Sequence, residues 1–116
     1  MEGVVDERGI PVIDIFIGGR TWAATLDTGF NGDLELPEAL RPFVNPRYAG
    51  RAESFLAGAV SISEDHYRVS FPFDDATVSA VATFMPGEGI LIGTRLLKPY
   101  RLTVDFPDSR VWIERD

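Results

Sequence analysis

One short segment of the sequence combines residue types that could do chemistry, the run Thr-Leu-Asp-Thr-Gly at residues 25–29. Apolar residues lead into Asp27, so a strand would deliver its carboxyl group to a loop. Thr28 could anchor that loop through its hydroxyl group, and Gly29 would let the backbone come close to another chain. A carboxyl group in such a place can act as a general acid or base if a second one lies beside it.

Two carboxyl groups about 3 Å apart cannot both ionise, so they share one proton and titrate as a pair. The charged member can then take a proton from water while the protonated member donates to a peptide carbonyl oxygen. The sequence contains Asp-Thr-Gly only once, so one chain cannot build the pair from two such motifs. A twofold homodimer could build it, because an axis close to Asp27 would place the two copies side by side.

The elements that must position Asp27 are short strands, because period-two alternation of apolar residues recurs more than the helical period. Residues 12–17 and 21–26 predict a hairpin with Gly18 and Gly19 at its turn, and Asp27 follows the second strand. Further strands are predicted over residues 34–36, 52–56, 59–62, 67–73, 77–85, 90–92, 101–106 and 110–114.

Two helical turns complete the expected pattern. Residues 37–40 begin with a proline, which suits a first helical position. Pro99 would stop a second helix over residues 94–98. The strands on either side of Gly58 are expected to form an exposed hairpin rich in small residues.

The composition is that of an ordinary soluble globular protein, with 45% apolar and 25% charged residues in a chain of 116. A chain of this length predicts a single domain over residues 1–116, in which residues 1–10 could be flexible. No stretch approaches the roughly 18 apolar residues of a membrane span, and the acidic start lacks the apolar region of a signal peptide. We therefore expect a cytoplasmic protein with no membrane partner.

Charge and residue types argue against several classes of partner and cofactor. The net charge of -7 and the single lysine, Lys98, argue against nucleic acid, whose binding depends on clustered Lys and Arg. The lack of cysteine excludes disulfides, thiolate zinc sites and a cysteine nucleophile. His66, the one histidine, is more typical of a surface or strand residue than of a ligand, so neither a metal site nor a cofactor is predicted.

Two segments of the sequence resemble the retropepsin-like aspartic proteases, a dimeric family. The segments are TLDTGFNGDLELP at residues 25–37 and GILIGTRLLKPYRLTVDF at residues 89–106. In that family the Asp-Thr-Gly motif is followed later by large aliphatic residues, a glycine and a short helix with a leucine pair. The resemblance implies a mostly β fold, a closed acid-protease-like (retropepsin) barrel with one short helix near the C-terminus.

The resemblance also implies roles for individual residues. It makes Asp27 the catalytic carboxylate of an aspartic endopeptidase, paired with Asp27 of an identical second chain. It assigns Thr28, Gly29 and Asn31 to the active-site loop and to contacts with the substrate backbone, with Thr28 gripping the loop of the opposite subunit. Residues that would support this loop are Ile92, Gly93 and Thr94.

The partners implied by the resemblance are a second copy of the chain and an extended peptide or protein substrate. The hairpin tip at Ala57, Gly58 and Ala59 would be the flap that closes over the bound peptide.

The sequence departs from the retroviral members of the family at two positions. Those members carry an Arg directly after the second glycine and an Asp two places after the glycine of the first motif, and the two usually form an ion pair. Here the positions hold Thr94 and Asn31, for which a neutral contact could replace the ion pair.

Two alternatives remain open from the sequence. A catalytically weak or inactive module with the retropepsin fold could bind peptides by strand addition or serve dimerisation. An unrelated small β domain could use Asp27 only to close a turn.

Overall fold

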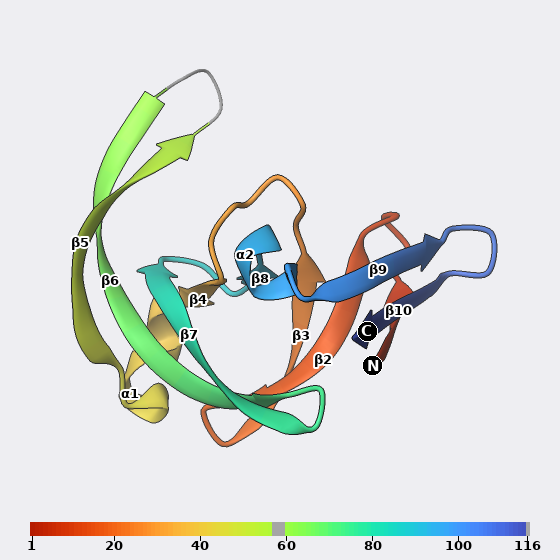
Figure 1. Ribbon diagram of the computed structural model, residues 1–116, viewed down its shortest axis with the longest axis horizontal. Helices are drawn as coiled ribbons and strands as arrows, with labels where there is room; N and C mark the ends of the chain where they lie inside the picture. Colours follow the sequence, from red (N-terminus) through yellow and green to blue (C-terminus); the bar gives the residue numbers. More distant parts are fainter. Residues whose placement is uncertain (57–59, 116) are drawn as a thin grey trace.

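The computed structural model describes residues 1–56 and 60–115, apart from the side chains of residues 54–56. Strands hold 62% of the chain and helices 10%, so the expectation of a mostly β fold is confirmed. None of the helices in these residues is long and apolar enough to cross a membrane. The elements follow in the order β1 (Glu2–Val5), β2 (Pro11–Ile17), β3 (Arg20–Leu26), β4 (Leu34–Pro37), η1 (Glu38–Leu40), α1 (Arg41–Val44), β5 (Arg47–Leu56), β6 (Val60–Phe73), β7 (Ala76–Met85), β8 (Ile90–Ile92), α2 (Thr94–Leu97), β9 (Tyr100–Asp105) and β10 (Arg110–Arg115) (Figure 1).

The strands of the described residues form one sheet, in the order β5-β6-β7-β4-β8-β3-β2-β1-β10-β9. The two end strands, β5 and β9, do not pair, so the sheet is not closed and the expectation of a closed barrel is wrong. The sheet instead curls until β6 packs against β2. Apolar faces can cover one another in this way without hydrogen bonds between the end strands.

The expected helix after β8 forms as α2, but its expected position near the C-terminus is wrong. The hairpin of β9 and β10 follows it and pairs over six residues, from Arg110↔Asp105 to Arg115↔Tyr100. This hairpin adds two strands to the sheet, so α2 connects two parts of the sheet and does not end the fold. Two other short helical segments, η1 and α1, follow β4.

The predicted hairpin that leads to Asp27 is present as β2 and β3. The two strands pair from Val12↔Thr25 to Ile17↔Arg20. Gly18 and Gly19 have φ angles of 64° and 86°, a region that glycine adopts without steric strain. The turn therefore fixes the register that places Asp27 at the end of β3.

Strand alternation builds the core between the curled halves of the sheet. In β2, Ile13, Ile15 and Ile17 are buried, whereas Asp14 and Phe16 face solvent. Burial of each isoleucine contributes about 1.5–3 kcal/mol. The core thus anchors the strand next to β3 and gives the loop after Asp27 a rigid base.

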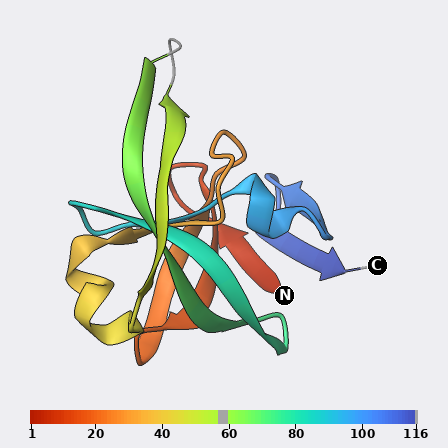
Figure 2. The same ribbon diagram turned by 60° about the vertical axis from the view of Figure 1, so that its left-hand side comes forward.

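A long hairpin of β5 and β6 extends beyond the rest of the sheet. β6 pairs with β7 only from Phe73↔Ala76 to Tyr67↔Ala82, whereas β5 and β6 remain paired as far as Leu56↔Val60. The register between β5 and β6 shifts between Tyr48 and Gly50, at the level where the pairing with β7 stops. We call residues 50–56 and 60–66 the arm, and Figures 1 and 2 show it rising away from the sheet.

The N-terminal strand β1 lies between β2 and β10, a place that the sequence analysis did not predict. Glu2 pairs with Trp112 and Val4 with Val12. The amino group of Met1 donates to the carbonyl oxygen of Ile113 at 2.9 Å. The segment Glu-Gly-Val-Val is too short, and its glycine too unfavourable in a strand, to give a clear signal in the sequence.

Candidate active site

Asp27 stands where β3 ends and a loop begins, and the backbone on both sides holds it. Leu26 pairs in parallel with Ile92 of β8, and the next N–H, that of Asp27, donates to the carbonyl oxygen of Ile92 at 2.9 Å. The carbonyl oxygen of Asp27 accepts from the N–H of Phe30 at 3.1 Å. One carboxylate oxygen of Asp27 accepts from the N–H of Gly29 at 2.9 Å. The carboxylate is therefore oriented by its own loop.

We call residues 27–33 the Asp27 loop. The segment after β8 is hydrogen-bonded to this loop. Three backbone hydrogen bonds join them: from Thr94 N–H to Phe30 O at 2.8 Å, from Gly93 N–H to Asp33 O at 3.0 Å, and from Arg95 N–H to Gly32 O at 3.2 Å. Because the bonds involve main-chain atoms, the position of the loop follows from the pairing of β8 with β3 and β4. Residues far apart in the sequence thus form one rigid unit.

Gly93 is required here by lack of space. A Cβ atom at this position would collide with the carbonyl oxygen of Gly32 and lie 2.7 Å from both the carbonyl oxygen and a ring carbon of Phe30. The glycine therefore lets the segment after β8 pass directly under the Asp27 loop.

The neutral contact expected between Thr94 and Asn31 is present, although it is long. The hydroxyl oxygen of Thr94 lies 3.5 Å from Asn31 Oδ1 and 3.4 Å from the carbonyl oxygen of Phe30, and its one proton can be donated to either acceptor. The structure therefore places Asn31 beside Thr94, while Gly93 and Ile92 bond to Asp33 and Asp27 of the same loop.

Thr28 and Gly29 lie at the exposed side of the Asp27 loop. Within the described residues, the side chain of Thr28 has no hydrogen-bond partner, whereas Asp27 and Asn31 both have one. The hydroxyl group is thus available for a contact outside this chain.

Asp33 and Glu35 are two residues of the site that the sequence analysis missed. A carboxylate oxygen of Asp33 accepts from the N–H of Val81 at 2.9 Å, which ties the end of the loop to β7. Glu35 lies in β4, opposite Leu91 of β8 and Thr83 of β7. A charged residue between two leucines was the signal in the sequence that could have drawn attention to Glu35.

Glu35 lies within electrostatic reach of Asp27. Burial raises the pKa of the Glu35 carboxyl group, and the negative charges of Glu64 and Asp27 raise it further. Among the described residues no cation pairs with Glu35. β4, which is separated from β3 by β8, therefore carries a second carboxyl group that interacts with both Asp27 and Glu64 of the arm.

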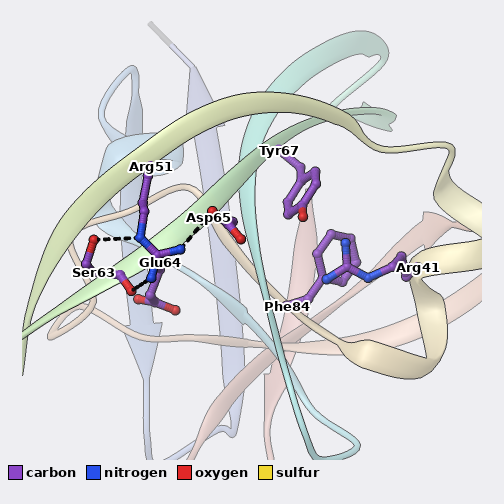
Figure 3. Close-up of a pocket in the computed structure, with 7 residues that line it drawn as sticks. All are labelled: Arg41, Arg51, Ser63, Glu64, Asp65, Tyr67 and Phe84. Carbon is purple, nitrogen blue, oxygen red and sulfur yellow. Dashed lines mark hydrogen bonds and ion pairs between the residues drawn. The ribbon is translucent and has the colours of Figure 1, made fainter.

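A cavity of about 240 Å³ lies between the arm and the body of the molecule. On one side Arg51 donates to Asp65 at 3.1 Å and to the Ser63 hydroxyl group at 3.0 Å, while Glu64 has no partner of opposite charge in the described part of the chain (Figure 3). The residues that line this cavity are Arg41, Arg51, Ser63, Glu64, Asp65, Tyr67 and Phe84.

Arg41 forms the other side of the cavity and fastens the base of the arm. Its guanidinium carbon lies 4.7 Å from the ring centre of Tyr67 and 4.2 Å from that of Phe84 (Figure 3). Its Nε donates to Glu38 at 2.6 Å, and this hydrogen bond raises the pKa of Arg41. A permanent cation thus joins η1 and α1 to the strands that carry the arm.

The expected flap residues Ala57, Gly58 and Ala59 lie outside the described residues. The ring nitrogen Nε2 of His66, in β6, is buried and has no hydrogen-bond partner in the part of the chain that the structure describes. In the described ranges no group of three or more His, Cys, Asp or Glu side chains is placed to hold a metal ion.

Comparison with known proteins identifies the fold. No protein-family model matches the sequence, and no curated protein sequence matches it. Among solved structures, the chain is similar to a retropepsin-like aspartic protease from Rickettsia conorii, with a TM-score of 0.68 over 97% of this chain and 88% of that one. The two sequences are 13% identical, so the likeness is one of fold. The chain described here therefore shares its fold with a retropepsin-like aspartic protease.

Proposed function

We propose that the protein is an aspartic endopeptidase whose active site forms when Asp27 meets its copy in a homodimer. The observation that carries this proposal is the support of the Asp27 loop by the segment after β8, which holds one carboxylate at a strand end and leaves Thr28 exposed. The fold shared with a retropepsin-like aspartic protease supports the same function.

The reaction would use the two carboxyl groups and one water molecule. The charged Asp27 takes a proton from the water, whose oxygen attacks the carbonyl carbon of the peptide, while the protonated Asp27 of the other copy donates its proton to the carbonyl oxygen. The tetrahedral product then collapses, returning one proton to a carboxylate and passing another to the amide nitrogen as the C–N bond breaks. The N–H of Gly29 keeps one carboxylate oxygen of Asp27 in place through these transfers.

The substrate would lie in extended form between the Asp27 loop and the arm. The arm rises on the same side of the molecule as the loop, and the cavity at the base of the arm offers space for a side chain (Figures 2 and 3). An extended peptide presents its carbonyl groups to this space one after another, which suits cleavage of unfolded chains.

The test is cleavage of an unfolded protein substrate between about pH 4 and pH 7, the range in which a carboxyl pair can hold one shared proton. We expect the natural protein to cleave and Asp27→Asn to be inactive. Asp14→Asn, on the exposed face of β2, is the matched control and should retain full activity. If the natural protein and Asp27→Asn leave the substrate equally intact throughout, the protein is a peptide-binding or dimerisation module with this fold.

A further inference from the structure

We propose that Glu35 and Thr83 form a subsite for a positively charged side chain, so that the protein favours peptides with Lys or Arg close to the cleaved bond. The inference deepens the proposed function and rests on it, because it names the class of substrate that the same site would take. It commits to one ligand chemistry, a cationic side chain of an extended peptide.

A row of residues in register crosses four strands beside the Asp27 loop. Thr25 of β3 is in register with Leu91 of β8. Leu91 is in register with Glu35 of β4, and Glu35 with Thr83 of β7. Because residues in register face the same side of a sheet, these four side chains share one face.

This face is turned away from the core. The neighbours of Glu35 in β4, Leu34 and Leu36, are buried in the core, so strand alternation turns Glu35 to the opposite side. The carboxyl group of Glu35 interacts with the charge of Asp27 and with that of Glu64 in the arm. Glu35 therefore faces the space between the Asp27 loop and the arm, where the substrate would lie.

Thr83 carries a polar group that its surroundings do not satisfy. The residue is only 8% exposed, yet in the described ranges no hydrogen bond involves its hydroxyl group. It lies directly across from Glu35, whose carboxyl group has neither a cation nor a hydrogen-bond donor as partner in the same part of the chain. Covered polar groups are normally paired, so two neighbouring acceptors without donors indicate a place for a ligand that donates.

An ammonium or guanidinium group fits these two acceptors. Such a group donates several hydrogen bonds and accepts none, and both a carboxylate and a hydroxyl oxygen can accept from it. Burial and the negative charges of Asp27 and Glu64 raise the pKa of Glu35, and a cation beside the carboxyl group would oppose this effect. An anionic side chain would instead meet like charges and be repelled.

The two arginines near the base of the arm are already paired. Arg41 donates to Glu38 at 2.6 Å. Arg51 donates to Asp65 at 3.1 Å (Figure 3). Neither arginine is therefore free to neutralise Glu35, and this position remains open to a cation from the substrate.

The experiment compares peptides that differ in one side chain. Each peptide carries lysine, norleucine or glutamate at one position near the scissile bond, and each position is varied in turn. Norleucine has the same carbon chain as lysine but no amino group. At one position we expect kcat/KM for the lysine peptide to exceed that for the norleucine peptide at least about tenfold, the effect of one hydrogen bond between charged groups. The glutamate peptide should be cleaved most slowly.

Variants of the subsite test which groups cause this preference. Glu35→Gln keeps the shape and removes the charge, so the lysine and norleucine peptides should be cleaved within about threefold of each other. Glu35→Asp keeps the charge and should retain part of the preference. Thr83→Val, which removes only the hydroxyl group, should lower the preference for lysine and leave cleavage of the norleucine peptide unchanged. The matched control, Asp14→Asn on the exposed face of β2, should keep the full preference.

The outcomes separate the subsite from the proposed function. A preference for lysine that survives Glu35→Gln overturns the subsite. Equal cleavage of the lysine and norleucine peptides by the natural protein, with Asp27→Asn inactive, also overturns it and leaves the proposed function in place. If the natural protein cleaves no peptide, the dissociation constants of the same peptides, measured by isothermal titration, decide. Tighter binding of the lysine peptide that Glu35→Gln abolishes supports the subsite and removes the endopeptidase, whereas equal binding removes both.

Discussion

Gly93 is a residue of the site at which there is no space for a side chain. A methyl group at this position would meet the carbonyl oxygen of Gly32 and the ring of Phe30, so either the Asp27 loop or the segment after β8 must move. We expect Gly93→Ala to lower the free energy of unfolding by about 2–4 kcal/mol in urea titrations. Gly89→Ala is the control, because nothing lies within 4 Å of its added Cβ. Equal effects of the two changes would contradict the crowding described here.

Glu35 predicts a stability that depends on pH. Its pKa is raised above the ordinary value of 4.5, so the folded protein favours the protonated carboxyl group and the favourable contribution disappears as the pH rises through the folded pKa. Glu35→Gln should therefore melt at the same temperature as the natural protein near pH 4 and at a higher one at pH 7.

The expected gain from Glu35→Gln at pH 7 is below about 1 kcal/mol, because solvent screens a carboxyl group that is only partly covered. Thermal unfolding at the two pH values measures it, with the exposed Glu88→Gln as control. A gain of the same size at both pH values would show that ionisation of Glu35 is not the cause.

The sequence allowed some residues of the site to be predicted and hid others. Asp27, Asn31 and Thr94 could be assigned because they belong to two contiguous segments that resemble a known family. Glu35 could not be assigned in this way. Its position near Asp27 depends on β4 lying between β7 and β8, and local residue patterns do not predict pairing between strands that are far apart in the sequence.

At the scale of the elements, the carboxylate of Asp33 joins the Asp27 loop to β7. Asp33→Ala would leave the N–H of Val81 without its acceptor, and we expect a loss of about 1–3 kcal/mol in the free energy of unfolding. Hydrogen exchange at Val81 should become faster by a corresponding factor. Asp108→Ala, in an exposed turn, is the comparison and should change neither quantity. Unchanged exchange at Val81 would mean that this hydrogen bond does not hold the loop.

The strands were predictable where apolar residues alternate, as in β2, and less so where tertiary contacts extend an element. Residues 59–62 and 67–73 were expected as separate strands, but residues 60–73 form one continuous strand, β6. The polar residues between them gave no strand signal, and pairing with β5 keeps them extended. The short α1 was missed because its four residues carry a proline and no helical period.

At the scale of the whole molecule, closure of the sheet was the expectation that failed. Closure depends on whether β5 and β9 pair. These two strands are more than forty residues apart in the sequence, and the residues of neither strand indicate whether it pairs with the other. Within the described residues the open sheet leaves one edge of β5 and one edge of β9 without a neighbouring strand, whereas a closed barrel would leave none.

An active site shared by two chains predicts how mixtures behave. If natural protein and Asp27→Asn are mixed equally at constant total concentration and allowed to exchange subunits, only about one quarter of random dimers hold two natural chains. We expect the cleavage rate to fall to about this fraction of the rate of the natural protein alone. A fall to one half would indicate that each chain works by itself.

The arm has a consequence for how a peptide could reach Asp27. β6 pairs with β7 only from Tyr67 to Phe73, so the arm is joined to the rest of the sheet at its base alone. Arg41 stacks on the ring of Tyr67 at this level, and Gly50, which is also there, has a φ of 112°. A bend there would open or narrow the entrance without breaking a single pair between β6 and β7. Access would then be controlled by a hinge within two continuous strands, and amides of β6 before Tyr67 should exchange with solvent sooner than those after it.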